Sequence, residues 1–483
     1  MKKVLITRRL IRESEDKASK LFDAKFNTND ELYSQKKIIE MSEGCDGILS
    51  SLTEKLDAET INQLPNSVKI ISNFAVGFGN IDLEAAKNRG IAVTNTPEVL
   101  SDATAEIGIL LILGACRRAS EGIESAKEGG WKWSADYLIG KQLTGTRLGI
   151  LGMGRIGQKI AKIAKSLGMV IHYHNRSKLS EDKASKLFEA KFNTNDELYS
   201  QKKIIEMSEG CDGILSSLTE KLDAETINQL PDSVKIISNF AVGFGNIDLE
   251  AAKNRGIAVT NTPEVLSDAT AEIGILLILG ACRRASEGIE SAKEGGWKWS
   301  ADYLIGKQLT GTRLGILGMG RIGQKIAKIA KSLGMVIHYH NRSKLSEDKE
   351  QGATYHDSIK SLFSVSDVLS ICCPATKETE NLINKETVEY FPKGAVITNV
   401  ARGDIVDDEA LIDALNRRKI YAAGLDVYKN EPNLNPGYLK IPSAFVLPHL
   451  GSATKDTRIA MGNLAVDNLD EFFRTGNCIN KVN

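Results

Sequence analysis

The feature that most constrains this chain is an internal repeat the size of a domain. Residues 14–183 recur as residues 180–349 with an offset of 166 positions, and the copies differ only at Asp23 against Glu189 and Asn66 against Asp232. Repeats of this length do not build solenoids, whose units are much shorter. Removing one copy leaves 483 − 166 = 317 residues, enough for two domains. We therefore interpret the repeat as an insertion into an already complete protein.

Composition excludes several classes of partner. Lysine plus arginine equals aspartate plus glutamate at 62 each, so the formal net charge of zero indicates neither a nucleic-acid nor a membrane partner. The apolar run at 273–282 is too short to span a bilayer, and the amino terminus does not resemble a signal peptide. Seven cysteines lack metal-ligand or disulfide-scaffold spacing, so we expect no metal and a cytoplasmic location.

Strand-like and helical segments alternate along the chain, which predicts an α/β protein with parallel sheets. The expected strands of the first copy lie at 3–7, 45–51, 68–74, 91–95, 147–151 and 170–174. Those of the unique region lie at 368–373, 395–399, 422–426 and 445–448, and they continue a sheet that begins at 313.

A glycine-rich turn predicts a dinucleotide site. Gly318, Gly320 and Gly323 follow the strand at 313–317 and precede a helical segment. Such glycines allow a tight turn and close approach to pyrophosphate, and the helix amino terminus faces the phosphates. The alternative is a purely structural turn. The same motif at 152–157 lacks the later strands of the fold, so we expect it to bind cofactor weakly or not at all.

The next strand indicates which cofactor is bound. It ends in Asn341, Arg342 and Ser343, where an NAD enzyme usually has an acidic residue for the ribose 2′-hydroxyl. An arginine here favours the 2′-phosphate of NADP(H), with NAD(H) as the second possibility. The alternative is that Arg342 is only a solvated loop residue.

Candidate chemistry lies where strands of the unique region end, the edge at which open α/β sheets bind ligands. Arg402, Glu431 and His449 are placed there, and His449 and His356 are the two histidines outside the repeats. Imidazolium is a suitable proton donor near neutral pH, a carboxylate raises its pKa, and arginine binds carboxylates bidentately. We expect His356, in polar helical sequence, at the surface. The alternative is three unrelated polar residues that cap strands.

These segments carry a family resemblance. Residues 399–404 (NVARGD), 424–428 (GLDVY) and 448–454 (PHLGSAT), with the glycine motif, resemble the D-isomer-specific 2-hydroxyacid dehydrogenase family. Residues 213–220 (GILSSLTE) and 239–248 (NFAVGFGNID) look most like its glyoxylate/hydroxypyruvate reductases. The resemblance covers the whole chain once one repeat is removed.

The resemblance implies the site residues. His449 would donate the proton, Glu431 would be its carboxylate partner, and Arg402 would grip the substrate. The implied substrate-binding residues are Leu218, Ala241, Val242, Gly243 and Arg402. The implied cofactor-binding residues are Thr270, Gly318, Gly320, Arg321, Ile322, Gly323, Asn341, Arg342, Ser343 and Asp426, the last orienting the nicotinamide carboxamide.

The resemblance also implies the domain organisation. Residues 1–100 would form a flavodoxin-like lobe, 101–167 a linking helix with a partial Rossmann unit, 168–266 the second flavodoxin-like lobe, 267–450 the complete Rossmann domain, and 451–483 a helix returning to the second lobe. A homodimer is expected through the apolar helix at 268–284. The substrate would be a small 2-oxo or 2-hydroxy acid.

Two copies of one lobe leave open which of them completes the active site. Chain order favours the second copy, but the first retains its opening strand and could compete by swapping. Because 4–6 aligns with 170–172, we expect the strand at 170–174 to replace the lost first strand of the second lobe.

The resulting functional hypothesis is NADPH-dependent reduction of glyoxylate or hydroxypyruvate. The alternatives are a dinucleotide-binding scaffold on the same fold and an inactive duplication product. Fold alone does not decide among them.

Overall fold

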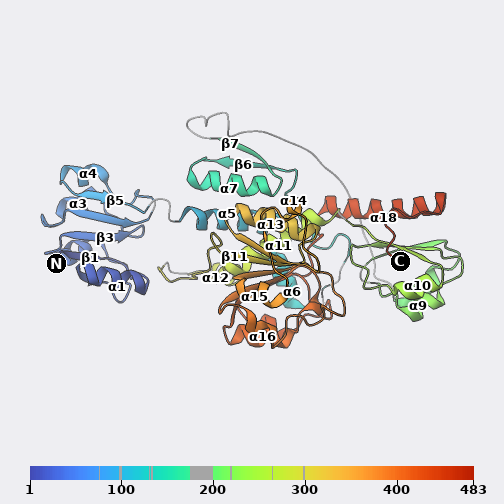
Figure 1. Cartoon of the computed structure of the whole chain (residues 1–483). Coiled ribbons are helices and arrows are strands. Elements are labelled where there is room, and N and C mark those ends of the chain that lie inside the picture. The colour runs from blue at the N-terminus through green and yellow to red at the C-terminus, as the bar shows by residue number, and fades with distance from the viewer. Residues whose placement is uncertain are drawn as a thin grey trace. The chain divides into compact units, whose positions relative to one another are not determined.

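The computed structural model describes residues 1–75, 77–96, 100–129, 131, 134–174, 200–217, 220–263, 265–296 and 300–483. Its strands form parallel sheets with helices between them, so the predicted α/β class is confirmed (Figure 1). The chain divides into two compact units, residues 1–104 with 290–305, and residues 105–289 with 306–483.

The first unit contains the first flavodoxin-like lobe, a five-stranded sheet in the order β2-β1-β3-β4-β5. Asp57 and Asp82 accept hydrogen bonds from backbone N–H groups in the first turns of α3 and α4, which fixes where these helices begin. Residues 290–305 belong to the same unit, and Asp302 among them forms an ion pair with Arg9 at 2.7 Å. The elements are β1 (Lys3–Ile6), α1 (Arg12–Leu21), β2 (Asp23–Phe26), α2 (Gln35–Met41), β3 (Gly47–Ser51), α3 (Ala58–Gln63), β4 (Ile70–Phe74), α4 (Leu83–Asn88) and β5 (Ala92–Thr94).

The centre of the second unit is a seven-stranded parallel sheet in the order β13-β12-β11-β14-β15-β16-β17. The chain order reverses between β11 and β14, and ligands bind at such a switch point. Its elements are β11 (Arg313–Leu317), α13 (Arg321–Ser332), β12 (Val336–His340), α14 (Glu347–Glu350), β13 (Thr354–Tyr355), α15 (Ile359–Val365), β14 (Val368–Ile371), η2 (Thr387–Tyr390), β15 (Ala395–Asn399), η3 (Gly403–Ile405), α16 (Asp408–Asn416), β16 (Ile420–Leu425), α17 (Pro436–Leu439) and β17 (Ala444–Val446).

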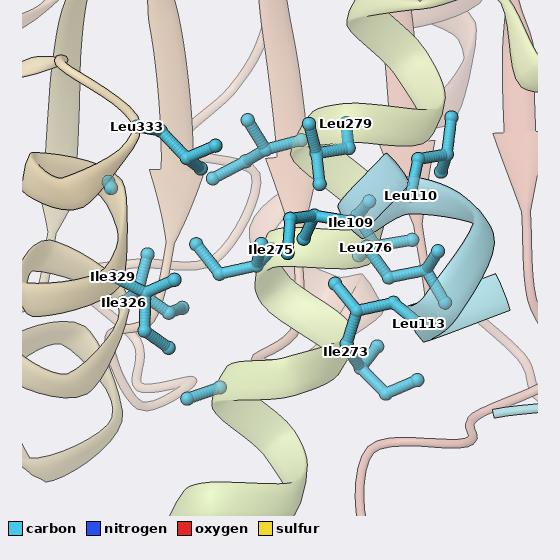
Figure 2. Packing of buried hydrophobic residues seen from close by; sticks show 14 of the residues in the cluster. Ile109, Leu110, Leu113, Ile273, Ile275, Leu276, Leu279, Ile326, Ile329 and Leu333 are labelled. Carbon is cyan, nitrogen blue, oxygen red and sulfur yellow. The ribbon is translucent and has the colours of Figure 1, made fainter. Parts of the chain in front are cut away.

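Helix α11 (Ser267–Cys282) forms the centre of the core. Fifteen of its sixteen residues are buried, because it is apolar on all sides and lies between the sheet, α13 and α5 (Ser101–Cys116). Figure 2 shows Ile275, Leu276 and Leu279 of this helix among side chains of the other two helices. The close approach to the sheet requires Gly424, since a Cβ there would lie 2.7 Å from the Leu277 carbonyl oxygen.

The second flavodoxin-like lobe belongs to the same unit. Its described strands pair in the order β10-β9-β8, and the C-terminal helix α18 packs across them (Figure 1). Ser238 of β9 donates to the carbonyl oxygen of Ala465 at 2.7 Å, and the chain end adds a bond from the Val482 N–H to Val259. The elements are α8 (Gln201–Met207), β8 (Gly213–Ser217), α9 (Ala224–Gln229), β9 (Ile236–Phe240), α10 (Leu249–Asn254), β10 (Ala258–Thr260) and α18 (Lys455–Thr475).

The prediction that residues 170–174 replace the first strand of the second lobe is wrong. Strand β7 (Val170–His174) pairs in parallel with β6 (Arg147–Leu151), in a separate two-stranded sheet. The physical reason is local. Helix α7 (Arg155–Ser166) joins the two strands in a βαβ unit, and the register Leu148↔Ile171 repeats the register Leu314↔Ile337 of the second copy. The remaining helices are α6 (Ala119–Glu128) and α12 (Ala285–Glu294).

Candidate active site

The candidate catalytic side chains meet at the carboxyl edge of the seven-stranded sheet. Arg402 follows β15, and His449 follows β17. The turn after β15 is held by Asn399, whose side chain donates to the Arg402 carbonyl oxygen at 2.8 Å and accepts from the Ala401 N–H at 2.9 Å. A side chain at the end of one strand thereby fixes the position of the arginine.

His449 and Glu431 form a direct pair. The imidazole Nδ1 lies 2.6 Å from Glu431 Oε2, and Oε1 of the same carboxylate accepts from the Tyr428 N–H at 2.8 Å. Both side chains are largely buried. Burial lowers the pKa of His449, but the charge and hydrogen bond of Glu431 raise it more, so this pKa lies above its ordinary value of 6.5. This arrangement can hold a proton on the imidazole near neutral pH.

Asp426 supports the loop that follows His449. Its carboxylate accepts from the backbone N–H groups of Leu450 at 2.6 Å and Gly451 at 2.8 Å. Burial raises the pKa of Asp426 to about 7, against the opposing effect of the His449 charge and of these backbone bonds. Thr270 lies at the same loop, because a Cβ at Gly451 would be 3.4 Å from its Oγ1.

The loop of the second flavodoxin-like lobe lies against Arg402. A Cβ at Gly243 would collide with the Arg402 guanidinium, which leaves the arginine next to the backbone of that loop. Asn239 donates to the Gly243 carbonyl oxygen and Asn261 to the Val242 carbonyl oxygen, each at 2.8 Å. Ala241 is buried beside them, whereas Leu218 lies outside the described residues.

A cradle for a dinucleotide lies at the carboxyl end of β11. Gly318 has φ +96°, and a Cβ there would lie 2.5 Å from the backbone nitrogen of Cys373. Asn341 accepts from the Met319 N–H at 2.6 Å and so holds the turn. Helix α13 begins at Arg321, directly after Gly320, where an added Cβ meets no described atom within 4 Å. The tight turn, the helix terminus and the open space fit a pyrophosphate.

The other predicted cofactor residues differ in their exposure to solvent. Arg321, Arg342 and Ser343 are exposed, and Ile322 is partly buried. The expectation that His356 lies in a helix is wrong, because it directly follows β13; it is partly exposed, and its Nε2 lies 2.9 Å from His338 Nδ1.

Several residues of the site were not predicted from the sequence. Asn399, Asn239 and Asn261 hold the two loops that carry the candidate substrate groups. An asparagine at the end of a buried strand was a usable signal for Asn399. Arg117 of the first repeat also reaches the site, since its guanidinium donates to the carbonyl oxygens of Leu450 at 2.8 Å and Gly451 at 3.1 Å. No sequence pattern links residues so far apart.

The described residues show neither a metal cluster nor a membrane-spanning helix. Among the described residues, no group of three or more histidine, cysteine, aspartate or glutamate side chains is placed to hold a metal ion. Within the same described ranges, no helix combines the length and apolar character needed to cross a membrane.

Comparison with known proteins identifies the family. The model of the D-isomer specific 2-hydroxyacid dehydrogenase NAD-binding domain matches residues 109–247 and 275–451, and that of the catalytic domain matches 4–167. Glycerate dehydrogenase from Hyphomicrobium methylovorum is 42% identical over 56% of this chain and 85% of its own length. Glyoxylate reductase from Thermococcus kodakarensis is 40% identical over 54% of this chain and 80% of its own.

A solved structure agrees with this result. The NADPH-dependent glyoxylate/hydroxypyruvate reductase from Sinorhizobium meliloti, in complex with NADP and malonate, is 29% identical, with a TM-score of 0.55 over 70% of this chain and 97% of that one. The chain therefore belongs to the D-isomer-specific 2-hydroxyacid dehydrogenase family. It is an NAD(P)-dependent oxidoreductase, and the NAD-binding domain model matches it in two separate stretches, which is consistent with the duplication.

Proposed function

We propose that this chain reduces a small 2-oxo acid, glyoxylate or hydroxypyruvate, to the 2-hydroxy acid with NADPH, and that His449 donates the proton. The observation that carries the proposal is the 2.6 Å pair of His449 and Glu431 at the sheet edge that also holds Arg402. Glyoxylate reductases among the relatives support the choice of substrate.

Substrate binding requires groups for a carboxylate. Arg402 offers a planar guanidinium that can bind a carboxylate through two hydrogen bonds. The backbone amides of Val242 and Gly243 would bind the same carboxylate from the second lobe, because their loop lies against Arg402. Ala241 and Leu218 would line the remainder of this subsite with apolar surface.

Proton transfer is the task of His449. Because Glu431 occupies Nδ1, the transferable proton would be held on Nε2, toward the substrate oxygen. Glu431 stabilises the imidazolium and keeps the ring in one orientation. When bound, the reduced nicotinamide supplies the hydride that completes the reduction.

The cofactor residues have distinct tasks. Gly318, Gly320, Gly323, Arg321 and Ile322 would hold the pyrophosphate at the start of α13. Asp426 and Thr270 would orient the nicotinamide end, and Asp426 also fixes the His449 loop.

The preference for NADPH rests on the end of β12. Asn341, Arg342 and Ser343 would surround the 2′-phosphate, and the exposed arginine is available for a charge-assisted contact. The NADP complex of the Sinorhizobium meliloti relative supports this choice.

We also propose that the protein works in the cytoplasm. Its seven cysteines are all free thiols, and burial raises the pKa of Cys282 and Cys372 to about 12, which makes them inert.

The test is a steady-state assay of the purified full chain with glyoxylate or hydroxypyruvate and either NADPH or NADH. We expect oxidation of the reduced cofactor with both acids and a higher kcat/KM with NADPH. Tight NADPH binding without turnover would instead support a dinucleotide-binding scaffold. Absence of both binding and turnover would support an inactive duplication product.

A further inference from the structure

The two repeats contact one another through equivalent residues. The first-repeat segment is defined as residues 105–174, the part of the first repeat that belongs to the second unit and is described except at 130, 132 and 133. Residues 271–340 are its equivalent 166 positions later. Ser166 and Ser332 are equivalent positions, and their Oγ atoms lie 2.8 Å apart. A residue that meets its own equivalent lies on a two-fold axis.

Ion pairs on either side of this axis are reciprocal. Arg117 pairs with Glu272 at 3.1 Å, and the equivalent Arg283 pairs with Glu106 at 2.8 Å. Glu272 also accepts from the N–H of Leu143, and Glu106 accepts from the N–H of the equivalent Leu309, each at 2.9 Å. Contacts of i with j and of j with i define an isologous interface, the kind that joins two copies of one subunit.

The apolar part of the interface has the same symmetry. Ile109, Leu110 and Leu113 of α5 are equivalent to Ile275, Leu276 and Leu279 of α11, and all six are buried in one cluster (Figure 2). The α7 side chains Ile163, Ala164 and Leu167 join this cluster with their α13 equivalents Ile329, Ala330 and Leu333.

The symmetry is broken at the candidate active site. Arg117 donates to the carbonyl oxygens of Leu450 and Gly451, the two residues whose N–H groups bind Asp426. Nearby, the Gly140 N–H donates to Ala453. The loop after His449 is therefore held from one side by Asp426 and from the other by the first repeat. The first repeat contains no sequence equivalent of this loop, so the contact that Arg117 makes with the loop is not repeated by symmetry.

We propose that the first-repeat segment is a built-in second subunit: it fills the two-fold docking face of the Rossmann domain within one chain, and its Arg117 positions the His449 loop. The partner for this face is the chain itself. The homodimer expected through residues 268–284 would need the same face of α11, so the protein is a monomer with an internal pseudo-dimer. The positioning role of Arg117 rests on the proposed function, whereas the internal interface does not.

Cysteine cross-linking of the full chain tests the interface. In the double variant S166C/S332C, mild oxidation joins the two thiols as a disulfide, with two protons and two electrons passing to the added oxidant. We expect a product with the mass of one chain, 52.6 kDa, that migrates faster on a non-reducing denaturing gel. The single variants S166C and S332C should remain uncross-linked. A two-chain product from any of the three variants, or no bond in the double variant, would overturn the proposal.

Arginine variants test the positioning role. R117M should lower kcat on the order of 100-fold, as a misplaced catalytic group does, with little change in KM or in NADPH binding. R283M, which removes the reciprocal ion pair, should lower the melting temperature comparably and leave kcat unchanged. R117K should restore part of kcat, because lysine can still donate to the two carbonyl oxygens.

Equal loss of kcat in R117M and R283M would contradict the positioning role and indicate general destabilisation. If R117M does not fold, R117K against R283K is the same comparison with smaller changes, and equal kcat in these two variants would also contradict the role. An inactive parent chain with a normal intrachain cross-link would reject the proposed function and leave the internal interface intact.

Discussion

Strands β6 and β11 have the same sequence, Arg-Leu-Gly-Ile-Leu, and different surroundings. Leu317 at the end of β11 is 3% exposed, whereas the equivalent Leu151 of β6 is 88% exposed. The reason is that β11 lies between β12 and β14, whereas among the described strands β6 pairs with β7 alone. The strands of the unique region therefore bury β11. Strand β6 has the same sequence but lacks those strands, so it remains part of an incomplete binding domain.

The two flavodoxin-like lobes differ in the same way. Phe240 of β9 is 9% exposed and Phe74 of β4 is 41% exposed, although both strands read Ile-Ile-Ser-Asn-Phe. Helix α18 packs on β9, and because its sequence occurs once in the chain, it can complete one lobe only. The unique helix α18 thus packs on one of two nearly identical lobes, and that lobe is the one whose loop lies against Arg402.

The largest expected effect comes from His449, which has no equivalent in either repeat. H449N should lower the reductase kcat by about 10²–10⁴-fold, because general acid catalysis is lost, while NADPH still binds. H356N, at the other unique histidine, should leave kcat unchanged. Unchanged turnover in H449N would show that His449 is not the proton donor. It would contradict the conclusion that the unique region supplies the catalytic group.

The pH dependence of the reaction should show the effect of Glu431 on the pKa of His449. Reduction needs the imidazolium form, so the rate should fall as the pH rises through the His449 pKa, which lies above 6.5. E431Q removes the charge that raises this pKa, so the basic limb of the profile should move to lower pH. A limb that stays in place would show that the limiting group is not His449.

A glycine pair tests which lobe serves the site. G243A places a methyl group against the Arg402 guanidinium and should reduce kcat/KM on the order of 100-fold by displacing it. G77A is the matched change in the first lobe, where an added Cβ meets no described atom within 4 Å, and it should leave kcat/KM unchanged. The reverse result would show that the first lobe closes the site.

The sequence predicted much of this arrangement because its signals are local. The βαβ order, the glycine turn at Gly318 and the positions of Arg402 and His449 just beyond strand ends all follow from short patterns. The sheet that residues 170–174 join could not be predicted in this way. A strand whose sequence fits two sheets pairs with the one that its neighbouring elements place beside it. The contact of Arg117 with Leu450 spans 333 positions and depends on tertiary packing alone.

Two matched leucine variants compare the strands β11 and β6 by the free energy of unfolding. L317A should lower the free energy of unfolding by about 2–5 kcal/mol, as other large-to-small changes in a core do. L151A, at an exposed position, should change it by no more than about 0.5 kcal/mol. Urea denaturation of both variants provides the comparison, and equal losses would mean that a further element covers β6.

The smallest expected effect concerns cofactor choice. R342A should reduce the preference for NADPH over NADH roughly ten-fold, which corresponds to about 1.4 kcal/mol, because a charge-assisted contact to the 2′-phosphate is lost. R176A, the equivalent change in the first repeat, should leave the preference unchanged. Ratios of kcat/KM for the two cofactors decide the matter, and an unaltered ratio in R342A would show that this arginine is only a solvated loop residue.

The most direct test of one functional centre in a chain with two glycine motifs is the stoichiometry of NADPH binding. Gly318 lies in a complete cradle beside Cys373, whereas a Cβ at Gly152, with a similar φ of +92°, meets no described atom within 4 Å. Isothermal titration of the full chain should therefore give one NADPH per chain, and G318A should abolish it while G152A does not. Two equivalent sites per chain would contradict the account.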